Sequence, residues 1–186
     1  MKLLIAALLL TLTGAASAAT PLPADSVLQI ENVFTSQDGK PFTLAERRGR
    51  PQLVAMFYTS CQYMCPLIID TGKGVDHALS EAERGKLRVL LISLDPAKDT
   101  PAVLTATAAK RHVDITRWTL ARTEDEGVRK IAALLGVRYR KLANGEFNHT
   151  SALFLLDADG RILARTEQMG AKPDADFLAK VHAALK

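Results

Sequence analysis

Cys61 and Cys65 are the only cysteines in this chain, and three residues separate them. They follow an apolar run at residues 53–58 that is typical of a buried strand. Pro66 then favours the start of a helix, and because a residue before proline avoids helical backbone, we expect Cys65 at the N-cap. Backbone N–H groups and the helix dipole at such an end favour thiolates. The two sulfurs could therefore bind a soft metal ion or cycle between dithiol and disulfide.

Two thiolates leave most of a metal ion's coordination sphere open, so a further ligand is sought among the four histidines. Three of them are expected to be surface or half-buried residues without a ligand role: His77, His112 and His182. His149 lies in the largely polar stretch 144–151, directly before the apolar run 152–156. From this position alone, His149 is equally consistent with a ligand that reaches the cysteines and with a solvated loop residue. Met64 carries a thioether that can bind Cu(I), but packing onto the sheet is the preferred role.

The pattern of apolar segments predicts an α/β fold with a mixed sheet flanked by helices. The near-continuous apolar strands at 52–58 and 87–94 suggest parallel neighbours that are buried on both faces. Further strands are expected at 116–121, 137–141, 151–156 and 161–165. Helices are expected from Pro66 through Ala82, at 103–111, at 125–135 with Gly136 as its stop, and at 174–185. Residues 26–34 and 41–44 are expected to form an N-terminal β-hairpin around the turn at 37–40.

The loop at residues 95–101 should share a sheet edge with the cysteine loop, because the carboxyl ends of parallel strands meet at one edge. Thr100 and Pro101 are typical of an N-cap followed by a first-turn proline. Asp95 and Asp99 are interpreted either as turn and capping residues or as residues that border the site. Both interpretations remain open at this point.

The first residues are typical of an export signal. Lys2 precedes the apolar stretch 3–12, and Ala16-Ser17-Ala18 fits a cleavage pattern, so residues 1–18 are predicted to be a signal peptide whose removal leaves 168 residues (186 − 18). The apolar stretch is shorter than the roughly 20 residues of a membrane span. An uncleaved membrane tether is the alternative, and no nearby cysteine supports a lipoprotein anchor. Residues 19–25 are expected to be a flexible lead, and 26–186 one domain.

Composition argues against several classes of protein. A formal net charge of +4 is mild, and the basic clusters lack interleaved aromatic residues, which disfavours nucleic-acid binding. These clusters are interpreted as a solvated face or as a docking patch for an acidic protein: Arg47, Arg48, Arg50, Arg138, Arg140 and Lys141. A structural disulfide is also disfavoured, because the cysteine pair would close only a very short loop.

Three separated motifs resemble the Sco/SenC family: Tyr-Thr-Ser-Cys-x-x-x-Cys-Pro at 58–66, Ile-Ser-Leu-Asp-Pro-x-x-Asp-Thr-Pro at 92–101, and His-Thr-Ser at 149–151. The resemblance extends from about residue 29 to residue 166. It implies a thioredoxin-like fold and a copper site whose ligands correspond to Cys61, Cys65 and His149. One departure is Gln62, which stands where the family usually has proline and should alter the stiffness of the loop.

The family resemblance implies a periplasmic metallochaperone that assists assembly of the dinuclear copper centre of a respiratory cytochrome c oxidase. The expected partner is the copper-accepting oxidase subunit or another periplasmic copper or thiol protein, with the chain itself a monomer. The alternative is a dithiol–disulfide oxidoreductase, which uses Cys61 and Cys65 as its redox pair, and the resemblance does not decide the balance. A peroxidase is disfavoured because no arginine accompanies Thr59 in the motif.

Overall fold

The computed structural model describes residues 20–186, so the expected signal peptide lies outside the described residues. The helices are η1 Val27–Gln29, η2 Leu44–Arg47, α1 Met64–Ala78, α2 Glu81–Lys86, α3 Pro101–Lys110, α4 Asp125–Leu135 and α5 Ala175–Ala184. The strands are β1 Phe34–Ser36, β2 Pro41–Phe42, β3 Gln52–Phe57, β4 Arg88–Ser93, β5 Trp118–Arg122, β6 Tyr139–Lys141, β7 Phe147–His149, β8 Leu153–Leu156 and β9 Ile162–Thr166. The α/β class with a thioredoxin-like mixed sheet is confirmed.

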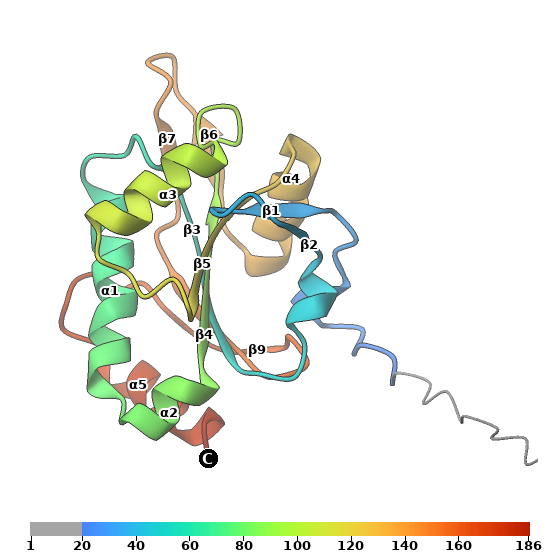
Figure 1. The fold of residues 1–186 in the computed structure, drawn as a ribbon, viewed down its shortest axis with the longest axis vertical. Helices are drawn as coiled ribbons and strands as arrows, with labels where there is room; N and C mark the ends of the chain where they lie inside the picture. Colours follow the sequence, from blue (N-terminus) through green and yellow to red (C-terminus); the bar gives the residue numbers. More distant parts are fainter. Residues whose placement is uncertain (1–19) are drawn as a thin grey trace, which may run out of the picture.

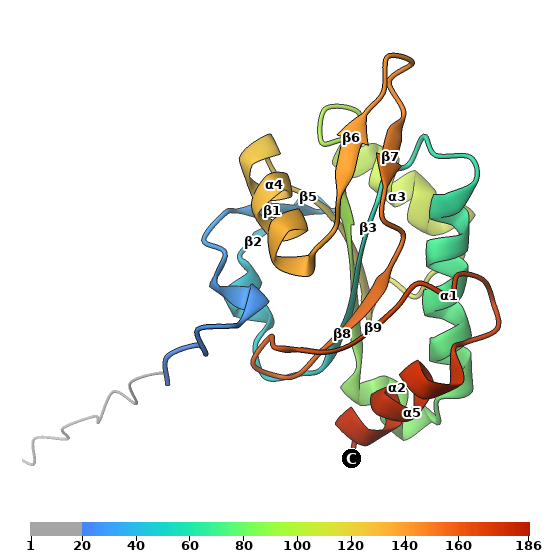
Figure 2. The same ribbon diagram turned by 180° about the vertical axis from the view of Figure 1, so that it is seen from behind.

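The main sheet has the strand order β2-β1-β5-β4-β3-β8-β9. Strands β3, β4 and β5 are parallel neighbours, and β8, β9, β1 and β2 add antiparallel edges. Helices α1 and α3 lie on one side of this sheet and α4 lies on the other (Figures 1 and 2). Every residue of β3 is buried, as expected for a strand that is covered on both faces. The carboxyl ends of β3 and β4 therefore share one edge, as the sequence predicted.

Helix α1 begins earlier than expected, and the predicted N-cap position of Cys65 is wrong. The N-cap is Tyr63, and Cys65 lies in the first turn, one residue before Pro66. Proline is tolerated there because the first-turn N–H groups have no partner within the helix. The helix also ends at Ala78 rather than continuing through Ala82, since Leu79 is extended and Ser80 caps the separate helix α2.

Two further segments differ from expectation. Residues 26–34 contain the 3-10 helix η1, so the first strand of the N-terminal hairpin is confined to Phe34–Ser36. The stretch before residue 150, expected to be a loop, contains strand β7, which pairs antiparallel with β6. This β6–β7 hairpin forms a small second sheet that projects beyond the end of the main sheet (Figures 1 and 2).

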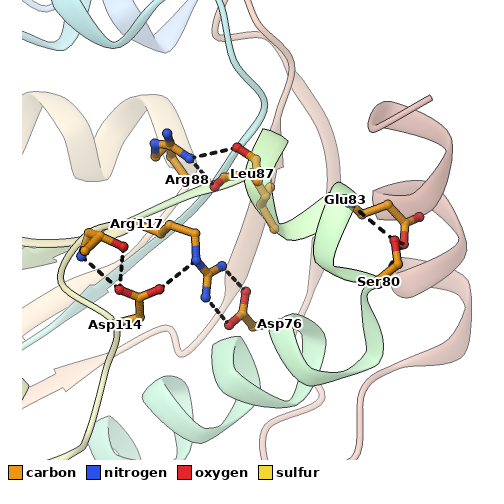
Figure 3. A network of polar contacts seen from close by, with 9 residues as sticks. Asp76, Ser80, Glu83, Leu87, Arg88, Asp114 and Arg117 are labelled. Atoms are coloured by element: carbon orange, nitrogen blue, oxygen red, sulfur yellow. Dashed lines mark hydrogen bonds and ion pairs between the residues drawn. The ribbon is translucent and has the colours of Figure 1, made fainter.

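The far end of α1 is held by an ion-pair network (Figure 3). The Arg117 guanidinium donates from Nη2 to Asp76 Oδ2 at 2.8 Å and from Nη1 to Asp76 Oδ1 at 2.5 Å. Its Nε also donates to Asp114 at 2.8 Å. These carboxylates raise the pKa of Arg117 above its ordinary value, chiefly through the Asp76 hydrogen bonds. The network ties α1 to the segment that leads into β5.

Residues 20–25 contact the domain: Leu22 packs against the core, and the carbonyl of Thr20 accepts a hydrogen bond from Arg48. The domain boundary at residue 26 stays a prediction. Within residues 20–186, no helix has the length and apolar character needed to cross a bilayer.

Candidate functional site

The structure brings Cys65 and His149 together at the sheet edge where β3 ends. Cys65 lies in the first turn of α1, and His149 is the last residue of β7. The Cys65 Sγ is 3.9 Å from His149 Nε2. Cys61 lies in the loop between β3 and α1, where its Sγ accepts the backbone N–H of Cys65 at 3.4 Å. The three predicted ligands therefore lie together at this edge of the sheet, although 84 residues separate Cys65 from His149.

The two thiols are free and have different surroundings. Cys65 is only 2% exposed, and its Sγ accepts the Tyr58 N–H at 3.3 Å. Burial raises the pKa of the Cys65 thiol well above its ordinary value. Cys61 is half-buried, which by itself would raise its pKa, but the N–H groups of Cys65 and Tyr63 that donate to its sulfur hold that pKa below the ordinary value. Cys61 is thus the sulfur that ionises first and meets solvent.

His149 is oriented by its own strand end. Its Nδ1 lies 3.1 Å from the Thr150 carbonyl, and because a carbonyl oxygen only accepts hydrogen bonds, Nδ1 carries the proton. In the neutral imidazole this leaves the lone pair of Nε2 directed at Cys65. Burial lowers the pKa of His149, which favours the neutral form. A neutral imidazole is suited to metal binding when Nδ1 is hydrogen-bonded to a backbone carbonyl and Nε2 has a free lone pair near the sulfur.

Tyr58 is a supporting residue whose role the sequence did not reveal. Its hydroxyl donates to the Phe147 carbonyl and accepts the Phe147 N–H, each at 3.3 Å. Its ring packs edge-on against His149 with the ring centroids 5.8 Å apart. Burial raises the pKa of Tyr58 to about 12, so the hydroxyl stays protonated and can donate. Tyr58 therefore joins the end of β3 to β7 and fixes the distance between the cysteine loop and His149.

The structure answers the question left open for Asp99. This carboxylate is fully buried and accepts the Thr59 N–H at 3.1 Å, the Thr59 hydroxyl, and the Ser93 hydroxyl at 2.5 Å. Asp99 thereby links the loop after β4 to the loop that leads to Cys61. It borders the site by positioning Thr59 and does not line the cleft beside the cysteines.

Asp95 has the role of a turn residue. Its N–H donates to Ser93, and its carbonyl accepts the N–H groups of Lys98 and Asp99. Its side chain is buried, with Lys98 Nζ 3.7 Å from Oδ2. The carboxyl end of β4 is therefore closed by a compact turn that also carries Asp99.

A cleft of about 360 Å³ opens beside the sulfurs, and its lining includes Tyr58, Cys61, Met64, Phe147 and His149. Met64 thus faces the site region, which differs from the expectation that it packs onto the sheet. No three His, Cys, Asp or Glu side chains among residues 20–186 are arranged to hold a metal ion as they stand. Cys65 and His149 are the pair already in contact.

The remaining histidines lie elsewhere. His77 is exposed on α1, and His112 is exposed after α3 with a positive φ of 51°. His182 on α5 pairs through Nδ1 with Glu83 Oε1 at 2.6 Å, which joins α5 to α2. None of the three lines the cleft.

A thioredoxin-like sheet with a dithiol at the start of a helix and an imidazole opposite it defines a class of thiol-based redox and soft-metal proteins. Residues 23–186 match the SCO1/SenC family model, and this chain belongs to that family. It is 25% identical to the SCO1 protein homolog of Bacillus subtilis over 159 residues, which is 81% of this chain and 79% of that protein.

Solved structures share the fold. Bradyrhizobium japonicum ScoI, solved with copper bound, aligns with a TM-score of 0.68 and 23% identity, covering 82% of this chain and 96% of ScoI. BsSco, described as a member of the Sco family of cytochrome c oxidase assembly proteins in work that identified a disulfide switch, aligns with a TM-score of 0.69 and 23% identity, covering 82% of this chain and 90% of BsSco. The prediction of family membership is confirmed.

Proposed function

We propose that this chain is a metallochaperone that binds copper through Cys61, Cys65 and His149 and supplies it to the dinuclear copper centre of a respiratory cytochrome c oxidase. The observation that carries the proposal is the 3.9 Å approach of His149 Nε2 to Cys65 Sγ, with Nδ1 engaged by Thr150. Membership of a family with copper-bound structures and oxidase assembly proteins supports it.

The donor set suits copper as a cargo. Thiolates are soft ligands that select Cu(I), and an imidazole nitrogen extends the set to Cu(II). Three protein ligands leave a position open through which an acceptor can take the ion. The half-buried Cys61 borders the cleft and is the sulfur that an incoming ligand would displace first.

We place this function outside the cytoplasm because of the export signal predicted at residues 1–18. The bacterial periplasm is the compartment proposed, with the domain either released by cleavage or tethered by an uncleaved leader. A monomer remains the proposed oligomeric state.

The test compares copper binding by the reduced parent protein with that of His149→Ala, Cys61→Ser and Cys65→Ser. The parent should bind one equivalent and show thiolate-to-copper absorption with Cu(II). His149→Ala should retain Cu(I) more weakly and lose most of its Cu(II) affinity, while either serine variant should lose both. His77→Ala is the matched control, because His77 is exposed on α1 and does not line the cleft. If His149→Ala binds Cu(II) like the parent, or Zn(II) displaces copper in competition, the proposal is wrong.

A second candidate function is supported by the two free thiols and their unequal exposure. The Cys61 thiolate would attack one sulfur of a substrate disulfide and release a substrate thiolate. Cys65 would then attack the Cys61 sulfur, release the second thiolate and leave a Cys61–Cys65 disulfide, so that two electrons pass to the substrate. Cys65→Ser should trap the mixed disulfide between Cys61 and a disulfide substrate, and a parent protein that forms no internal disulfide on oxidation would exclude this function.

A further inference from the structure

The β6–β7 hairpin carries three exposed cations close to the proposed copper ligand. Arg138 directly precedes β6, and Arg140 and Lys141 lie within it. Among residues 20–186, no ion pair with a carboxylate is formed by any of the three. Lys141 instead lies over the Phe147 ring, 5.6 Å from its centroid. We call these three residues the basic hairpin surface.

The register of the hairpin connects this surface to His149. Tyr139 pairs with His149 and Arg140 pairs with Asn148, so Arg138 and Arg140 lie on the hairpin face opposite Tyr139. Lys141 pairs with Phe147 and lies on the same face as His149. A hollow of about 340 Å³ is lined by Arg138, Arg140 and His149 together with Tyr139, Asn148 and Thr150. His149 also lines the cysteine cleft. The imidazole therefore stands between the two cysteines and the cationic hollow.

Neighbouring charges leave the surface positive. Glu146, the acidic residue of the hairpin, is hydrogen-bonded to Asn144 in the turn. Lys98 from the turn after β4 lies beside the hairpin at Gly145 and is shared with Asp95. On the α4 side, the opposite charges of Asp125 and Arg129 have opposing effects on the pKa of Tyr139. The three cations are thus the dominant local charge.

We propose that the basic hairpin surface docks an acidic patch on the protein that accepts copper from this chain. This docking role rests on the metallochaperone function proposed above. Docking there would bring the acceptor's own ligands against His149 and the open side of the copper site. An anionic membrane is a poorer fit, because lipid head groups at this hairpin would cover the copper ligand and supply no acceptor. Complementary charge of this kind mainly accelerates association and is weakened by salt.

The experiment measures Cu(I) transfer from the loaded protein to two synthetic peptides. Both carry the same two-cysteine copper-binding sequence, which is flanked by glutamates in one peptide and by lysines in the other. Rates are compared at ~10 mM and ~1 M salt, where the Debye length is about 30 and 3 Å. The variant combines R138E, R140E and K141E. The control is Lys180→Glu, an exposed charge reversal on α5 at the opposite end of the molecule (Figures 1 and 2).

At low salt the parent should transfer copper to the glutamate peptide about tenfold faster than to the lysine peptide. The triple variant should reverse this order with its copper content unchanged, Lys180→Glu should behave like the parent, and high salt should remove the differences. Equal rates to both peptides would overturn the docking surface alone. No transfer to either peptide at any salt would overturn the metallochaperone function and the docking with it. Binding of the parent but not the triple variant to phosphatidylglycerol vesicles, with charge-independent transfer, would assign the surface to a membrane.

Discussion

The two cysteines divide their roles through their surroundings. Cys65 is held in the first turn of α1 with its sulfur against the Tyr58 N–H, whereas Cys61 is half-buried and borders the cleft. A half-buried thiol with a lowered pKa can exchange ligands or attack a disulfide. A buried thiol beside it can retain the copper ion or resolve the mixed disulfide. The same arrangement therefore serves copper binding and thiol exchange.

Alkylation should separate the two sulfurs. The pKa of Cys61 lies below its ordinary value, so its thiolate, and with it the rate of reaction with iodoacetamide, should appear at lower pH than for a free cysteine. The pKa of Cys65 is raised by burial, so this residue should react slowly even at alkaline pH. Peptide mapping by mass spectrometry across a pH series measures both. Equal labelling of the two residues at neutral pH would contradict the assignment.

Asp99 should matter although it is not proposed as a ligand. Asp99→Asn keeps the shape but replaces one carboxylate oxygen by a donor that faces the N–H and hydroxyl of Thr59. We expect a loss of about 1–3 kcal/mol in the free energy of unfolding and a changed dithiol potential, because the Cys61 loop loses its anchor. Asp95→Asn is the comparison, since among residues 20–186 no side-chain hydrogen bond joins Asp95 to that loop and its carboxylate pairs with Lys98. Urea unfolding and redox titration of both variants test this, and an unchanged potential in Asp99→Asn would contradict the positioning role.

Helix α1 approaches β5 closely where Gly72 faces the Trp118 ring. A Cβ on Gly72 would lie 2.7 Å from the Trp118 ring, whereas a Cβ on Gly85 in α2 would meet nothing within 4 Å. Gly72→Ala should therefore lower the free energy of unfolding by about 1–3 kcal/mol despite the better helix propensity of alanine. Gly85→Ala should be neutral or stabilising by up to about 1 kcal/mol. Denaturant unfolding tests both, and a stabilised Gly72→Ala would show that the helix can move away from the sheet.

Elements with strong local signals were predictable from the sequence. The apolar runs of β3 and β4 showed buried parallel strands, Thr100-Pro101 marked the start of α3, and Gly136 with φ of 65° ends α4 as expected. Strand β7 was missed because it has only three residues and lacks an apolar run, although Asn144-Gly145 is a strong hairpin signal. Helix α2 was missed because its capping box at Ser80 and Glu83 was absorbed into the helical pattern before it.

The site was predictable only in part for a different reason. The types and order of Cys61, Cys65 and His149 suggested one chemistry, but their meeting depends on contacts between distant segments. Tyr58 reaches Phe147 across 89 residues, and Asp99 reaches Thr59 across 40. Local sequence patterns placed the loops after β3 and β4 at one sheet edge, but which side chains pair there is established only by the complete fold.

At the scale of the whole molecule, Arg117 closes the end of the domain opposite the hairpin. Asp76 is buried at 6% exposure, so Arg117→Leu would leave its carboxylate without a counter-ion and should lower the free energy of unfolding by about 3 kcal/mol. The double variant Arg117→Leu with Asp76→Leu should recover part of this loss, since no uncompensated charge remains. Denaturant unfolding provides the values, and copper affinity should stay near that of the parent. A double variant that is less stable than Arg117→Leu would contradict this account.

We propose above that one copper ion is held by two sulfurs and one imidazole. X-ray absorption spectroscopy of the copper-loaded protein measures this directly. Loaded with Cu(I), which His149→Ala should still bind, the parent should show two sulfur ligands near 2.3 Å, about the length of a metal–thiolate bond. It should also show the multiple-scattering pattern of one histidine, which should vanish in His149→Ala and persist in His77→Ala. A spectrum with the two sulfurs but no imidazole in the parent, or one that is unchanged in His149→Ala, would contradict the claim.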